Sequence, residues 1–193
     1  MEAIYTFKKI GHFEKGRWFE EKTLRVVPDN DPMDPREHRY DNLGHMVCFH
    51  RCYSLGDKHD IDEDDFCSWE EIADYLESEY GAVIILPLYL MDHSGLSMSV
   101  GSYNDPWDSG QVGFIYATYH DLNREYGNTF QESIDTATRV LIVEVEAYDA
   151  YLSGRYVGFV LEDETGEEMD SCWGYSDVKL IIEEYGFSWR DEV

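Results

Sequence analysis

A near-continuous apolar run, AVIILPLYLM at residues 82–91, constrains the fold of this chain more than any other segment. Such a run is typical of a central strand in a sheet. The segment LSMSV follows after a turn at His93–Gly95, so the two segments together predict a β-hairpin. The segment QVGFIYATY, residues 111–119, predicts another inner strand, and the core is therefore expected to contain a sheet.

Three segments carry the signals of helices. Ser68 as N-cap and Glu71 at the third helical position form a capping box, which opens a helix that stops at Gly81. A long amphipathic helix is predicted from Gln131 to about Leu152, and a final helix from its cap Ser176 to Gly186. In the first helix the apolar side chains share one stripe, which leaves its acidic side chains facing outward.

The remaining segments predict strands and loops. Residues 3–10, Thr23–Val27 and His45–Tyr53 favour strands, and residues 156–173 predict a hairpin around Glu164–Gly166. Three prolines mark residues 28–42 as a long loop, and residues 1–27 are expected to form a strand pair or an arm. We therefore predict an α+β fold: a mixed, mostly antiparallel sheet with about three packed helices, in a single acidic domain over residues 1–193.

Charge is the most unusual property of the composition. Acidic residues outnumber basic ones by 41 to 15, which gives a formal charge of −26. Two blocks dominate, because residues 57–80 hold eleven acids and one base, and residues 162–193 hold eleven acids and two bases. A chain this acidic repels nucleic acid and anionic membranes. A hydrophobic content of 43% and an aromatic content of 15% argue against a disordered or merely salt-adapted chain.

The cellular compartment is predicted from two further features. The first sixteen residues contain no apolar stretch typical of a signal peptide, and no apolar run approaches the roughly 20 residues that cross a bilayer. The four cysteines do not resemble a secreted disulfide framework, so buried free thiols are expected. We therefore expect a cytoplasmic protein.

The segment DIDEDDFCSWEE matches most of a twelve-residue calcium loop. Asp60, Asp62, Asp64, Ser68 and Glu71 fall at ligand positions, as does the carbonyl group of the residue at position seven. The glycine that turns such a loop is absent, no helix is predicted before the loop, and the capping box already explains Ser68 and Glu71. A solvated acidic loop is the preferred interpretation, and calcium binding is the alternative.

The segment HMVCFHRCY offers candidate ligands for a soft metal. The period of a strand places Met46, Cys48, His50 and Cys52 on one face. Zinc or copper could bind there if His93 or Cys172 came near, and a thiol paired with a histidine could act as a nucleophile. No second pair of ligands at knuckle spacing follows, so ordinary core packing is the preferred interpretation.

Two loops collect polar residues at predicted strand ends. Asp92 and His93 lie in one, and Asp105, Trp107 and Asp108 lie in the other. Aspartate and histidine together could hold a divalent metal for phosphodiester chemistry. Aspartate, serine, glycine and proline also form turns in their own right, which is the structural alternative. No nucleophile elbow, phosphate-binding loop, zinc-protease motif or dinucleotide fingerprint occurs.

Four strings carry a resemblance to a known family: DNLGHMVCFHRCYSLGD, LPLYLMDHSGLSMS, DPWDSGQVGFIYA and DSCWGY. The chain resembles a family of small acidic proteins of bacterial phages and mobile elements over most of residues 35–175. The string WDSGQVGFIY is the most specific part. The resemblance implies a phage or mobile-element context and carries over no catalytic residue. The basic opening strand and the acidic tail depart from the family pattern.

Context and charge together favour an anti-defence inhibitor, of the anti-restriction or anti-CRISPR type, that mimics DNA. A nuclease channel presents basic side chains to phosphates about 7 Å apart, twice the per-strand rise of about 3.4 Å, and carboxylates on a helix can approximate that spacing. We expect its partner to be the basic nucleic-acid-binding groove of a host nuclease. The partner-binding residues are predicted to be Asp60, Asp62, Glu63, Asp64, Asp65, Glu70, Glu71, Asp74, Glu77, Glu183 and Glu184.

The inhibitor hypothesis requires no catalytic residue, metal or cofactor, and no direct contact with nucleic acid or membrane. A homodimer is left open. The first alternative is a metal-assisted phage enzyme that acts on nucleotides or nucleic acids, with Asp92, His93, Asp105 and Asp108 at its site. The second alternative is a non-catalytic phage adaptor protein whose acidity serves solubility.

Overall fold

A computed structural model describes the chain except for residues 1, 10–11, 15–16, 38–40 and 128–129. The predicted α+β class is confirmed, and every strand pairing among the described residues is antiparallel. The sequence predicts one domain, whereas the described contacts group the chain into two compact units. Residues 34–153 form one unit, and the two ends of the chain, 1–33 and 154–193, form the other, called here the terminal unit.

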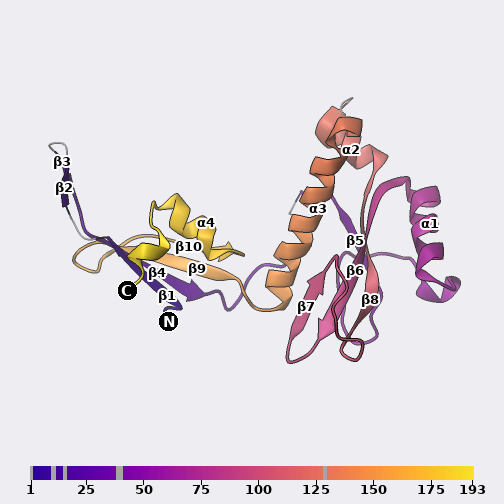
Figure 1. Ribbon diagram of the computed structural model, residues 1–193, viewed down its shortest axis with the longest axis horizontal. Helices are drawn as coiled ribbons and strands as arrows, with labels where there is room; N and C mark the ends of the chain where they lie inside the picture. Colours follow the sequence, from indigo (N-terminus) through magenta and orange to yellow (C-terminus); the bar gives the residue numbers. More distant parts are fainter. Residues whose placement is uncertain (1, 10–11, 15–16, 38–40, 128–129) are drawn as a thin grey trace. The chain divides into compact units, whose positions relative to one another are not determined.

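The 34–153 unit contains a four-stranded sheet between two helices (Figure 1). The strand order is β5-β8-β6-β7, so the apolar run lies in an inner strand, as predicted. The helix α1 packs on one face of this sheet, and α3 packs on the other. The elements are β5 (His45–Cys48), α1 (Trp69–Tyr80), β6 (Ala82–Asp92), β7 (Leu96–Ser99), β8 (Ser109–Thr118) and α3 (Phe130–Leu152).

Alternation along the inner strands divides the core between the two helices. In β8, Phe114 and Tyr116 contact the α1 side, while Ile115 and Ala117 contact the α3 side. Gly113 in the same strand has a steric role, because a Cβ atom there would lie 1.9 Å from the carbonyl oxygen of Val47 in β5. Close pairing of β5 and β8 therefore requires glycine at this position.

The helix α1 begins and ends where the sequence predicts. The Ser68 hydroxyl accepts the N–H of Glu71, and the Glu71 carboxylate accepts the N–H of Cys67 rather than that of Ser68. At the other end Gly81 adopts a left-handed conformation with φ of 69°, which glycine reaches without steric cost. Ile72 and Leu76 are buried against the sheet, so the opposite side of α1 faces solvent.

A buried ion-pair cluster, called here the Arg36 cluster, joins segments of the 34–153 unit. The Arg36 guanidinium donates to both carboxylate oxygens of Asp57 at 2.9 and 2.6 Å and to Glu144 on α3 at 3.1 Å. It also donates to the carbonyl of Gly44 at 2.7 Å, and Glu144 accepts the N–H of Leu43 at 2.7 Å. The Arg36 cluster therefore connects the loop before β5, the loop after it and α3.

The terminal unit is a second antiparallel sheet with strand order β1-β4-β9-β10. One helix, α4, buries Ile181 and Ile182 in a core that contains Phe7 and Phe159. The elements are β1 (Tyr5–Lys9), β2 (His12–Glu14), β3 (Arg17–Phe19), β4 (Lys22–Pro28), β9 (Val157–Glu162), β10 (Glu168–Tyr175), α4 (Val178–Glu184) and the short 3-10 helix η3 (Trp189–Asp191). The strands β2 and β3 pair only with each other among the described residues.

Several predicted boundaries are wrong. The strand β5 stops at Cys48 instead of Tyr53, because Phe49 and the residues after it enter a loop that returns to pair Gly56 with Val47. The cap of α4 is Asp177 rather than Ser176, since the Asp177 carboxylate accepts the N–H of Lys179. The described chain has four α-helices instead of about three, with α2 (Tyr119–Tyr126) as the addition. No described helix has the length and apolar content that a bilayer crossing requires.

We expect stability of the fold to fall at alkaline pH. Burial raises the pKa of the Cys48 thiol to about 12 from 9.0, and burial raises the pKa values of Tyr116 and Tyr148 to about 12 from 10.0. These groups ionise first in the unfolded chain, so they favour unfolding once the pH exceeds about 9. Urea unfolding should show a free energy of unfolding that is several kcal/mol lower at pH 11 than at pH 8. Each group contributes roughly 1.4 kcal/mol for every pH unit between its pKa in the unfolded chain and the pH of the measurement. An unchanged free energy of unfolding would contradict this prediction.

Candidate functional site

The nine predicted partner-binding acids between residues 60 and 77 are all exposed. They lie on the loop before α1, on the 3-10 helix η1 (Glu63–Asp65) and on α1 itself, at the side of the unit where α1 covers the sheet (Figure 1). We call this set the acidic face: Asp60, Asp62, Glu63, Asp64, Asp65, Glu70, Glu71, Asp74 and Glu77. Among the described residues, none of these acids forms a salt bridge.

The spacing of the acids on α1 follows from helix geometry. Glu70, Asp74 and Glu77 are separated by four and three residues, so they lie on one side of the helix. At a rise of about 1.5 Å per residue, these carboxylates project from points roughly 6 and 4.5 Å apart along the axis. Like charges at this spacing repel one another and destabilise an isolated helix.

Two members of the acidic face also have local structural roles. The Asp62 carboxylate accepts the N–H of Asp64 at 3.1 Å and caps η1. The Glu71 carboxylate accepts the N–H of Cys67 at 2.7 Å near the start of α1. Within the described chain, the other seven acidic side chains have no hydrogen-bond or ion-pair partner. Most of these carboxylates therefore form no polar contact within the described chain that would stabilise the fold.

The calcium alternative for the same segment gains no geometric support. In the part of the chain that the structure describes, no group of three or more histidine, cysteine, aspartate or glutamate side chains could hold a metal ion. Asp62 and Glu71 each bond to a backbone N–H, and they do so in different turns of the chain. The predicted ligands therefore do not converge in the structure.

The second predicted patch, Glu183 and Glu184 at the end of α4, belongs to the terminal unit. Both residues are exposed, but the side chain of each lies beside a hydrogen-bond donor or a cation from another side chain, and among the described residues the carboxylates of the acidic face have no such neighbour. The Tyr175 hydroxyl donates to Glu184 at 3.2 Å, and Lys179 lies 3.7 Å from Glu183. The acidic face on the 34–153 unit is therefore the denser unneutralised surface.

The predicted strand-end residues come together in part. The Nδ1 atom of His93 lies 2.6 Å from the Asp108 carboxylate, and the Tyr53 hydroxyl donates to Asp92 at 3.0 Å. Asp105 instead caps its own turn by accepting the N–H of Trp107 at 3.0 Å. The two loops therefore meet through the His93–Asp108 contact, and Asp105 takes part in turn formation.

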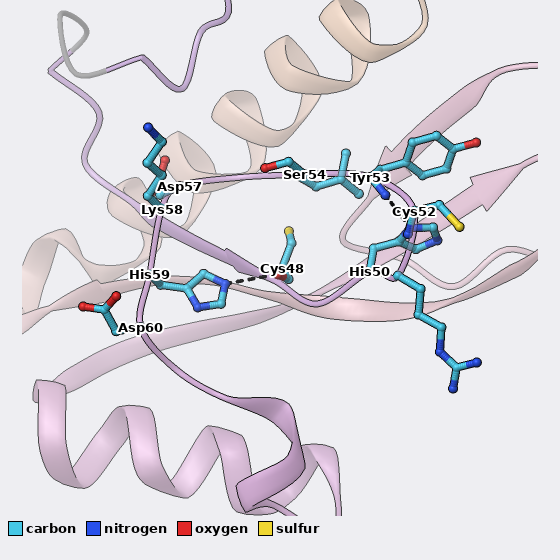
Figure 2. Close-up of a pocket in the computed structure, with 11 residues that line it drawn as sticks. Cys48, His50, Cys52, Tyr53, Ser54, Asp57, Lys58, His59 and Asp60 are labelled. Atoms are coloured by element: carbon cyan, nitrogen blue, oxygen red, sulfur yellow. Dashed lines mark hydrogen bonds between the residues drawn. The ribbon is translucent and has the colours of Figure 1, made fainter.

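A cavity of about 670 Å³ lies in the loop that follows β5 (Figure 2). Figure 2 shows His59 beside Cys48, the last residue of β5, with His50, Cys52 and Tyr53 grouped farther along the loop. The His59 Nε2–H donates to the Cys48 carbonyl at 3.1 Å, while the His50 Nδ1 accepts the N–H of Cys52 at 3.2 Å. The prediction that Met46, Cys48, His50 and Cys52 share one strand face is wrong, because β5 ends at Cys48 and the two later residues lie in the loop after it. Met46 and Cys48 pack in the core, which agrees with the preferred interpretation. The other three cysteines, Cys52, Cys67 and Cys172, are exposed instead of buried.

Two features of this unit are absent from the sequence-based predictions. Asp121 is buried, caps α2 together with Thr118, and lies 3.0 Å from the Nε2 atom of His45. Burial opposes ionisation of Asp121, but hydrogen bonds from Thr118 and the nearby His45 lower its pKa. The spacing of Thr118 and Asp121 is a capping-box signal that could have revealed α2. The second feature is the exposure of Trp107, which is 92% accessible to solvent.

Comparison of this chain with protein-family models, with curated proteins and with solved structures found no match. The resemblance to acidic phage proteins therefore stays a prediction.

Proposed function

We propose that this protein is an anti-defence inhibitor of phage or mobile-element origin that acts in the bacterial cytoplasm. In this proposal the acidic face enters the basic nucleic-acid-binding groove of a host nuclease and takes the place of DNA. The observation that carries the proposal is the acidic face itself, nine exposed carboxylates with no basic partner among the described residues.

The energetics of the acidic face favour a binding role over a structural one. Repulsion between Glu70, Asp74 and Glu77 costs stability in the free protein, and the fold recovers none of it through internal ion pairs. A partner rich in arginine and lysine would relieve this repulsion and form charge-assisted hydrogen bonds to the carboxylates. Complementary fields would also accelerate the encounter of the two proteins.

An enzyme is the alternative function, and one contact favours it. His93 and Asp108 form a histidine–carboxylate pair that resembles the orienting half of a general-base site. The other predicted members are engaged elsewhere, since Asp92 accepts a hydrogen bond from Tyr53 and Asp105 caps a turn. The inhibitor is therefore our first proposal.

The direct experiment is affinity capture from a bacterial lysate, followed by identification of the bound proteins. We expect the tagged protein to capture a nucleic-acid-binding protein, and we expect an excess of duplex DNA to release it. Capture of a DNA-binding protein that DNA does not displace would overturn the mimicry proposal. Conversion of a nucleotide or nucleic-acid substrate by the purified protein would favour the enzyme.

Salt dependence provides a further prediction for the captured complex. Several ion pairs form together in the proposed interface, so the affinity should fall by about tenfold or more between 50 and 200 mM salt. Isothermal titration calorimetry at several salt concentrations measures this slope. An affinity that stays constant across the range would indicate an apolar docking surface instead.

A further inference from the structure

Trp107 is the most exposed large apolar side chain in the described part of the chain, with 92% of its surface accessible. It lies in the turn that connects β7 to β8, in the 34–153 unit. Tryptophan is strongly enriched at the energetic centres of protein interfaces and costs little conformational entropy when it is immobilised. An indole in full contact with water therefore marks a candidate contact point.

The backbone under Trp107 is held in place. The Asp105 carboxylate accepts the N–H groups of Trp107 and Asp108 at 3.0 and 3.3 Å, and the Ser109 hydroxyl donates to the Asp105 carbonyl. The Asp92 N–H also donates to the Asp108 carbonyl at 2.8 Å, which fastens the turn to β6. Turn formation accounts for Asp105 and Ser109, but it gives no reason for a tryptophan at the tip.

The surroundings of the indole carry negative charge. Asp105 and Asp108 flank Trp107 in the sequence, and Asp92 belongs to the strand end that bonds to the same turn. His93 is the adjoining titratable group, with its Nδ1 atom 2.6 Å from Asp108. These carboxylates disfavour a nucleotide or an anionic lipid surface as the occupant. They favour a cation.

We propose that Trp107 stacks against an arginine side chain of the partner protein, with Asp108 as the carboxylate that pairs with the same guanidinium. The face of an indole ring attracts a cation, and a planar guanidinium can stack on the ring while its N–H groups bond to a neighbouring carboxylate. A lysine ammonium is a compact, strongly hydrated charge and stacks less well. The Trp107 turn would thus distinguish arginine from lysine.

This inference rests on the proposed function only in taking the partner to be a basic protein. The Trp107 turn and the acidic face are separate sets of residues, so each can be altered alone. The acidic face supplies attraction that depends on charge and salt. The Trp107 turn supplies selectivity for one kind of cationic side chain.

The test uses acetylated hexa-arginine and hexa-lysine amides as probes, titrated into the full chain at low salt by calorimetry. We expect hexa-arginine to bind about threefold to fivefold more tightly than hexa-lysine, as a single exposed cation–π contact would provide. Trp107→Ala should lose most of this preference, keeping only what arginine gains by pairing through its planar fork with other carboxylates. Trp107→Phe should keep a larger part of the preference. Trp173→Ala, which removes a half-exposed tryptophan of the terminal unit, should keep all of it.

Three results would overturn the inference: equal affinities of the native chain for the two peptides, an unchanged preference in Trp107→Ala, or the loss of preference in Trp173→Ala as well. Subtracting the fluorescence spectrum of Trp107→Phe from that of the native chain isolates the emission of Trp107. This emission should shift when hexa-arginine is added, and the absence of a shift would also contradict stacking. None of these measurements needs the host nuclease. Failure of lysate capture would therefore count against the proposed function and leave the Trp107 contact standing.

Discussion

Replacing Arg36 by methionine is expected to lower the free energy of unfolding by about 3–5 kcal/mol. Arg36 is only 8% exposed, and its guanidinium satisfies two carboxylates and a backbone carbonyl. Its removal leaves Asp57 and Glu144 close together without a positive charge. Removal of one partner leaves the other charge buried and uncompensated. The resulting loss of stability is far larger than the net stability that the ion pair itself contributes.

The pKa shifts in the Arg36 cluster agree with this expectation. Burial raises the pKa of Glu144, and the hydrogen bonds from Leu43, Arg36 and Gly44 offset only part of that rise. Burial alone would lower the pKa of Arg36, but the Asp57 and Glu144 carboxylates raise it above its ordinary value. Without Arg36, Glu144 is expected to take up a proton more readily.

Urea unfolding of Arg36→Met and Arg36→Lys beside the native chain measures the effect. Lysine keeps the charge but lacks the fork that bonds to both oxygens of Asp57, so an intermediate loss is expected. Arg25→Met is the matched control, because Arg25 pairs with Glu162 while about a third of its side chain is exposed. The control should lose about 1 kcal/mol or less. A loss of that size for Arg36→Met would contradict a buried role.

Reversal of four charges on the acidic face is expected to weaken partner binding by at least about a hundredfold. The variant replaces Asp62, Asp64, Glu70 and Asp74 by lysine. Each reversal turns an attraction to a basic groove into a repulsion, and close charge pairs across interfaces couple by about 1.5–7 kcal/mol. Circular dichroism should stay nearly unchanged, because these side chains face solvent and the cap that Asp62 provides belongs to the three-residue η1.

The matched control applies the same charge change elsewhere on the 34–153 unit. Lysine at Glu125, Glu132, Asp135 and Glu146 alters four exposed acids on α2 and α3. This control should reduce the affinity by less than about tenfold, since only the long-range field changes. Equal losses in the two variants would show that net charge, and not the acidic face, determines binding.

Much of the fold was predictable because the decisive signals are local. The hydrogen bond from Glu71 to Ser68 and the left-handed Gly81 determine the ends of α1. The apolar run of β6 specifies an inner strand whatever surrounds it. The end of β5 was not predictable, because it depends on Gly56 returning to pair with Val47. The division into two units depends on pairing of β4 with β9, far apart in the sequence.

Some features of the candidate site were predictable from local sequence, and others depend on contacts between distant residues. Exposure of the acids on α1 follows from the spacing of Ile72 and Leu76, which the sequence shows directly. The Arg36 cluster joins residues that are 21 and 108 positions apart, and no local pattern reveals such pairs. The sequence indicates a loop around Trp107, but the exposure of this side chain depends on whether any other segment covers the turn.

The most direct measurement is a competition between this protein and duplex DNA for the captured nuclease. A labelled duplex bound to the nuclease is titrated with the native chain, with the acidic-face variant and with the control variant. DNA mimicry predicts complete displacement of the duplex by the native chain and the control, and no displacement by Asp62→Lys, Asp64→Lys, Glu70→Lys and Asp74→Lys combined. A stable ternary complex of nuclease, duplex and native chain would contradict the account.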